Sequence, residues 1–212
     1  MKEDKLVSTT FKATEYVQKN QTPFIIGIVG IVVIFAAIMF FRWSGERKRT
    51  ESAALLSRAE MIGGMGQMEQ YTATLTMLAD DYSGTTAAKI ASLRLANDYF
   101  TQKQYDNALK YFTVLSDKYS DDKMVATSAA AGKAACYELK SDYAQAGKYY
   151  QQAADFKSGD IWTPGYLLKA GQNFAKAGDK KSAEAAFDAI AKNFGNSNEN
   201  NIAKRSLAEL RD

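Results

Sequence analysis

The sequence predicts an all-α protein in which a single N-terminal transmembrane helix is followed by an α-solenoid of helical hairpins. Three observations support this fold class. An apolar run of eighteen uncharged residues lies near the N-terminus, a pattern of small and aromatic residues recurs every 37 or 38 positions, and only two prolines occur in 212 residues. Because an interior proline breaks a helix, so few of them favour helix along most of the chain.

The apolar run, FIIGIVGIVVIFAAIMFF, extends from Phe24 to Phe41. As a helix it would be about 27 Å long, which is close to the hydrocarbon thickness of a bilayer. A helix also satisfies its own backbone polar groups, as lipid requires. Arg42 and Trp43 follow directly, and both side chains suit the membrane–water interface. We expect a spanning helix over residues 23–43, with Phe24, Phe41, Arg42 and Trp43 as its membrane anchors.

Two other interpretations of the run are a buried core helix and a cleaved signal peptide. The unbroken apolar length disfavours a core helix, because buried core helices usually have shorter apolar runs. About 22 residues precede the run, and the sequence at its C-terminal end, Met-Phe-Phe-Arg-Trp, contains no small-x-small cleavage site. We therefore expect an uncleaved signal-anchor, preceded by a cytoplasmic juxtamembrane segment over residues 1–22.

The composition of the remaining chain disfavours several classes of function. From Glu46 onward, 22 lysines and arginines face 21 acidic residues, whereas a nucleic-acid-binding surface needs concentrated positive charge. The chain has no histidine, which is the commonest general base and zinc ligand, and its lone Cys136 cannot form an intramolecular disulfide. We expect a protein that is not an enzyme, with no cofactor, no metal, no nucleic acid and no small-molecule substrate.

The recurring pattern consists of pairs of small residues twelve positions apart. An aromatic residue follows the first member of each pair by three positions and the second member by four. Small residues let two antiparallel helices approach closely, and the aromatics fill the space beside the contact. Such a hairpin cannot bury its apolar face alone, so hairpins stack. The pairs are Ala96 with Ala108, Ala134 with Ala146, and Gly171 with Ala183.

A degenerate first unit precedes these three, and a single helix follows them. Tyr71 occupies the small position of the first unit, next to the glycine-rich turn at 63–66. Thr163 and Pro164 predict an N-cap and the first residue of a helix. The polar-faced segment from Asn198 predicts a capping helix. Residues 46–212 should therefore form about four hairpins and a C-terminal cap.

The pattern resembles the tetratricopeptide repeat over roughly residues 52–195, although its unit is longer than the usual length of about 34 and lacks the closing proline. The resemblance implies a concave face lined by the first helix of each hairpin, where a protein partner would bind. Five further aromatics either anchor such a partner or pack between hairpins: Tyr111, Tyr149, Phe156, Trp162 and Tyr166. The residues expected on the concave face are Leu93, Asn97, Phe100, Ala131, Ala135, Glu138, Leu168, Gln172 and Lys176.

The order of segments is similar to that of the YfgM-like family of bacterial membrane-anchored proteins. The residues that carry this resemblance are YVQKN at 16–20, Arg42 and Trp43, and the hairpins that begin soon after. The resemblance implies an ancillary subunit of the Sec translocon in the bacterial inner membrane, whose hairpins meet client chains and chaperones in the periplasm. Four cations lie on each side of the span, so charge does not determine orientation. The alternative function is a structural scaffold in cell-envelope assembly.

Overall fold

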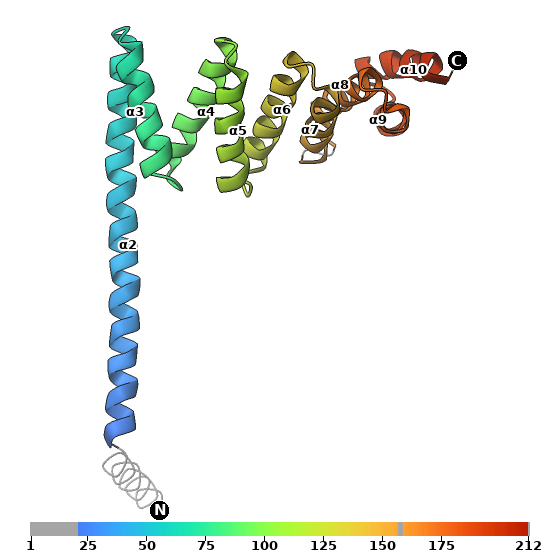
Figure 1. The fold of residues 1–212 in the computed structure, drawn as a ribbon. Helices are drawn as coiled ribbons and strands as arrows, with labels where there is room; N and C mark the ends of the chain where they lie inside the picture. The colour runs from blue at the N-terminus through green and yellow to red at the C-terminus, as the bar shows by residue number, and fades with distance from the viewer. Residues whose placement is uncertain (1–20, 157–158, 212) are drawn as a thin grey trace, which may run out of the picture. The chain divides into compact units, whose positions relative to one another are not determined.

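The structure of the protein, a computed structural model, describes residues 21–156 and 159–211. These residues contain only helices and the turns between them, which confirms the all-α prediction (Figure 1). The expected segment 1–22 lies almost entirely outside the described residues, as does the side chain of Phe24. The helices are α2 (Gln21–Gly64), α3 (Met68–Asp81), α4 (Thr86–Thr101), α5 (Tyr105–Lys118), α6 (Lys123–Leu139), α7 (Tyr143–Phe156), α8 (Thr163–Lys176), α9 (Lys180–Asn193) and α10 (Asn198–Arg211).

Helix α2 is 44 residues long and has the length and composition of a membrane span. Its apolar window has a mean hydropathy of 2.7, and none of that window is buried by the protein. The Arg47 guanidinium lies 6.0 Å from the centre of the Trp43 ring. The chain divides into two compact units between Thr50 and Glu51, and each is described by itself.

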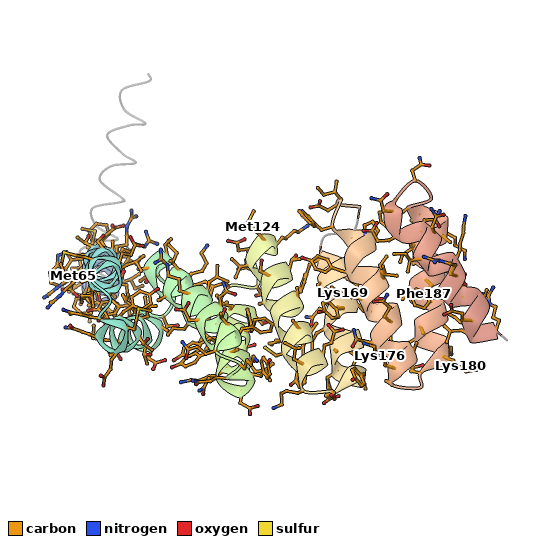
Figure 2. All side chains as sticks on the ribbon, turned by 90° about the horizontal axis from the view of Figure 1, so that it is seen from above. Met65, Met124, Lys169, Lys176, Lys180 and Phe187 are labelled. Carbon is orange, nitrogen blue, oxygen red and sulfur yellow. The ribbon has the colours of Figure 1, made fainter. Side chains whose placement is uncertain are left out.

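The second unit consists of four helical hairpins and a final helix. Residues 51–64 of α2 pair with α3, and the next three hairpins are α4–α5, α6–α7 and α8–α9, followed by α10. Figure 2 shows the hairpins in a row, with Met65 at one end and Phe187 towards the other. This arrangement confirms the predicted hairpin array and its C-terminal cap.

The turns inside the four hairpins share one hydrogen-bonding pattern. In the second hairpin, for example, the Gln104 amide donates to the Tyr99 carbonyl at 2.8 Å, and the Lys103 amide donates to the Phe100 carbonyl at 3.0 Å. Equivalent bonds close the other three turns, and each turn contains one residue with positive φ. This is the Schellman ending of a helix, in which a left-handed residue lets the chain reverse. The four left-handed residues are Gly66, Lys103, Ser141 and Gly178.

The predicted small residues are buried at contacts between helices. Ala108, Ala146 and Ala183 are completely inaccessible to solvent. Glycines contribute further close contacts, because a Cβ atom on Gly132 would lie 2.3 Å from the Phe112 ring of the preceding hairpin. A Cβ on Gly171 would similarly lie 2.5 Å from Phe187. Absent side chains on one helix thus make room for aromatic rings on its neighbour.

Two local features differ from simple expectation. Tyr71 replaces the small residue of the first hairpin, and a Cβ on Gly63 would lie 3.0 Å from its ring, so the turn glycine provides the missing space. Helix α8 begins at Thr163, and its N-cap residue is Trp162 without a side-chain capping bond. The predicted capping role of Thr163 is therefore wrong by one position, because Pro164 tolerates either of the first two helical positions.

We predict that Gly132→Ala destabilises the hairpin array. Alanine normally stabilises a helix relative to glycine by up to about 1 kcal/mol, but here its methyl group would clash with the buried Phe112 ring. Overpacking of this kind costs about 1–3 kcal/mol. Urea unfolding of the full chain in detergent would measure the loss.

Gly165→Ala is the matched control for this substitution. Gly165 lies in α8, and the nearest atom to its added Cβ would be 3.9 Å away. This variant should be as stable as the wild type or more stable. Equal stability of the two alanine variants would contradict the close contact at Gly132.

Candidate functional site

The nine residues predicted for the concave face lie on α4, α6 and α8, the first helices of three successive hairpins. Three of them, Asn97, Gln172 and Lys176, are exposed. The remaining six are half-buried, which means that part of each side chain contributes to packing: Leu93, Phe100, Ala131, Ala135, Glu138 and Leu168.

The apolar members of this set support the core as well as the surface. Leu93 and Phe100 pack against the core of the first two hairpins, and the Phe100 ring lies 5.8 Å from that of Tyr105. Leu168 packs against the second core cluster, around α8 and α9. These side chains therefore present only part of their apolar area to a partner.

Glu138 is the centre of a hydrogen-bonded network that joins α6, α7 and α8. Its Oε2 accepts a hydrogen bond from the hydroxyl of Tyr150 at 2.9 Å, and its Oε1 accepts one from Nδ2 of Asn173 at 3.2 Å. The Lys176 ammonium lies 3.9 Å from the same Oε1. Tyr150 and Asn173 are almost completely buried. This network fixes the orientation of the Glu138 carboxylate between two hairpins.

Two lysines of α8 place positive charge beside the rings of Tyr150 and Tyr143. Lys169 lies 3.3 Å from the Tyr150 hydroxyl and 5.0 Å from the centre of its ring. Lys176 lies 5.2 Å from the centre of the Tyr143 ring. Both lysines are marked on α8 in Figure 2. Around Glu138 the surface thus combines a half-buried carboxylate, two ammonium groups and the half-buried ring of Tyr143, while the Tyr150 ring lies beneath it.

A cavity of about 410 Å³ lies between α8, α9 and the cap helix α10. It includes the two predicted residues Gln172 and Lys176, and the buried Phe187 ring forms part of its wall. The mixture of apolar wall and polar rim resembles ligand pockets in general. The lining residues are Gln172, Ala175, Lys176, Phe187, Ser206, Glu209 and Leu210.

Of the five further aromatics predicted to anchor a partner or pack between hairpins, some pack inside the repeat domain and others are exposed. Tyr111 and Tyr149 stack on Tyr99 and Tyr137, with ring centres 5.8 and 5.5 Å apart and nearly parallel planes. These two therefore serve packing within hairpins. Trp162 is 63% exposed and is available to a partner. Tyr166 packs beside the second core cluster and Phe156 is half-buried.

Sequence reasoning did not identify Tyr150 or Asn173 as parts of the site. Tyr150 appeared as one of the repeating aromatics, and its hydroxyl has no counterpart in the equivalent Phe112 and Phe187. Asn173 occupies the position of Cys136 one hairpin earlier. For Tyr150 the detectable signal was a hydroxyl at a repeat position that is Phe in the neighbouring hairpins, whereas the position of Asn173 already varies in polarity, with Asp98 two hairpins earlier.

Catalytic and metal-binding chemistry find little support in the described part of the chain. No group of three or more acidic or cysteine side chains there could hold a metal ion. Cys136 is buried, and burial raises the pKa of its thiol to about 11, so the reactive thiolate is disfavoured.

The fold and this surface define a helical-repeat protein of the protein-interaction class. The chain belongs to the tetratricopeptide repeat-like domain family, whose model matches residues 14–163. A model described as tetratricopeptide repeat matches residues 166–197. The crystal structure of BtubC (BKLC) from P. vanneervenii has a similar fold, with a TM-score of 0.52 and 14% sequence identity. That match covers 66% of this chain and 62% of BtubC, so it spans less than two thirds of that protein.

The network around Glu138 predicts a specific pH dependence of stability. Burial, together with the hydrogen bond to Glu138, raises the pKa of Tyr150 above its ordinary value of 10.0. The folded state therefore holds this proton more tightly than the unfolded chain. Its contribution to stability is complete below about pH 10 and is lost as pH rises through the raised pKa. We expect a steeper loss of stability above about pH 10 in the wild type than in Tyr150→Phe.

Urea unfolding in detergent across that pH range would compare the two slopes. Tyr143→Phe removes a hydroxyl from the start of the same helix and is the control, since it should keep the wild-type slope. Identical slopes for the wild type and Tyr150→Phe would show that the Tyr150 proton does not contribute.

Proposed function

We propose that the chain is a membrane-anchored protein-interaction module and an ancillary subunit of the Sec translocon in the bacterial inner membrane. On this proposal residues 23–43 are an uncleaved signal-anchor and residues 1–22 are cytoplasmic. Residues 46–212 are the periplasmic repeat domain, which helps chaperones meet translocated chains. Partner segments bind the concave, inner face that α4, α6 and α8 form.

The observation that carries this proposal is the presence of an apolar helix and a hairpin array within one family match. That match begins at residue 14, before the apolar window of α2, and continues through the first three hairpins. The similarity of residues 16–20, Arg42 and Trp43 to the YfgM-like family supports the translocon as the site of action.

The chemistry of the inner face suits weak binding of peptide segments. It mixes half-buried apolar side chains with the amide of Gln172 and the charges of Glu138 and Lys176. Such a surface offers modest selectivity, and a tether near the exit of the translocon would raise its effective concentration. Affinities in the micromolar range or weaker would then suffice.

We predict that a photoreactive residue at Gln172 captures translocon subunits, chaperones or client chains in intact cells. Gln172 is exposed and lines the cavity beside α10. Gln152 is exposed on α7, the second helix of the α6–α7 hairpin, and is the control position. Mass spectrometry of the crosslinked products identifies the partners. Capture of translocon subunits from Gln152 and not from Gln172 would refute the inner face as the binding surface.

Client binding and the alternative scaffold function differ in their dependence on protein synthesis. Crosslinks to client chains should decline when translation is stopped with puromycin. A single partner that is captured equally with and without translation would favour a scaffold in cell-envelope assembly.

We also predict that the hairpin domain is digested by protease added to intact spheroplasts. A periplasmic domain is open to the added enzyme, whereas a cytoplasmic one is protected by the membrane. Immunoblotting with an antibody against the C-terminal hairpins measures the loss, with a cytoplasmic protein as the control. Full protection of the hairpins would reverse the proposed topology.

A further inference from the structure

A second cavity, of about 370 Å³, lies between the first hairpin and α4, and its lining includes none of the residues predicted for the concave face. Its volume falls in the range of roughly 300–1,000 Å³ that is usual for small-ligand pockets. Three of its residues are charged and two are glycines at the turn between α2 and α3. The lining residues are Glu60, Gly63, Gly64, Met68, Tyr71, Arg94 and Asp98.

The one positive charge in this cavity is already engaged. Nη2 of Arg94 lies 2.7 Å from Oε1 of Glu60, and the side chain of Tyr71 also interacts with the Arg94 guanidinium. Both interactions raise the pKa of Arg94, so its charge is permanent. An anionic guest would have to compete with Glu60 for this guanidinium.

Asp98 is the charged residue that remains without a direct partner. It lies one helical turn after Arg94 on α4 and is half-buried. Among the described residues its carboxylate makes no side-chain hydrogen bond or ion pair, and burial raises its pKa despite the nearby charge of Arg94. The three charged side chains of the cavity, Glu60, Arg94 and Asp98, therefore leave a net charge of one negative, and partial burial of a carboxylate without a direct partner is costly.

This arrangement is absent from the later hairpins. At the repeat spacing, Asp98 corresponds to Cys136 and then to Asn173, both of which are fully buried and uncharged. The equivalent of Arg94 is Gly132 in the next unit. An acidic cavity at the first junction is thus a feature of this one place and not a requirement of repeat packing.

We propose that this cavity binds a basic side chain, arginine in preference to lysine, of a polypeptide partner. The inference rests on the proposed function, since it names the chemistry of a segment that the repeat domain would bind. The guanidinium of the guest pairs with the Asp98 carboxylate, and its aliphatic stem lies against Met68 and the turn glycines. Arginine is favoured because its planar fork binds a carboxylate through two parallel hydrogen bonds.

The test uses the full chain, labelled with ¹⁵N, in uncharged detergent micelles. The probes are acetyl-Gly-Arg-Gly-amide, the lysine peptide, and the citrulline peptide, which has nearly the shape of arginine and no charge. The amides of Gly63 and Gly64 report on the cavity, because both residues line it. We expect saturable shifts with the arginine peptide, weaker binding of the lysine peptide and none of the citrulline peptide.

Two substitutions examine the charges directly. Asp98→Asn keeps the shape and should weaken arginine binding by about tenfold or more. Arg94→Gln releases Glu60 and should strengthen binding, a gain that misfolding would not produce. Asp80→Asn is the control, because it removes one exposed carboxylate from α3 in the same hairpin and should leave binding unchanged.

The outcomes separate this inference from the proposed function. Equal shifts with arginine and citrulline, or unchanged binding in Asp98→Asn, would overturn the basic-side-chain site. In that case crosslinking from Gln172 would still support partner binding on the inner face. Arginine binding that depends on Asp98 would support the cavity even if Gln172 captured nothing.

Discussion

The repeat domain depends on close contacts in which the absence of a side chain on one helix accommodates an aromatic ring from the next. Gly132 receives Phe112, Gly147 receives Phe174, and Gly171 receives Phe187. Because each of these rings is almost fully buried, little space remains for adjustment. The first two contacts join successive hairpins and the third joins the helices of one hairpin. The same kind of contact therefore stabilises the packing both between hairpins and within a hairpin.

This packing uses most of the apolar surface and leaves polar groups to distinguish one junction from another. The junction of α6, α7 and α8 contains Glu138 with two buried polar partners, whereas the first junction contains the salt bridge of Glu60 with Arg94 and the unpaired Asp98. A repeat protein can thus keep one backbone plan and vary its surface chemistry from unit to unit. Recognition in this family member would reside in these variations.

Some parts of the site could be predicted from the sequence and others could not. The positions of Gln172 and Lys176 followed from helical register, and both reach a cavity. Register also identified Leu93 and Phe100, but their partial burial depends on packing against neighbouring hairpins, which register does not predict. Arg94 and Asp98 are one helical turn apart on α4, but Glu60 meets Arg94 across 34 residues, and no local pattern predicts that contact. Similarly, the bond between Tyr150 and Glu138 depends on how two helices face each other.

The sequence by itself determined the fold class, the apolar helix, the number of hairpins and the small residues paired within three of them, whereas the close contacts at Gly132 and Gly147 came from the structure. The former features follow from local chemistry: the hydropathy of residues 24–41, helix propensity, and a repeat whose period is visible in one dimension. The tertiary structure decided that Gly63 accommodates Tyr71, that Lys103 and Ser141 adopt left-handed turns, and that Asp98 remains without a direct partner. Those outcomes depend on how each turn closes and how neighbouring helices pack, which only the folded hairpins define.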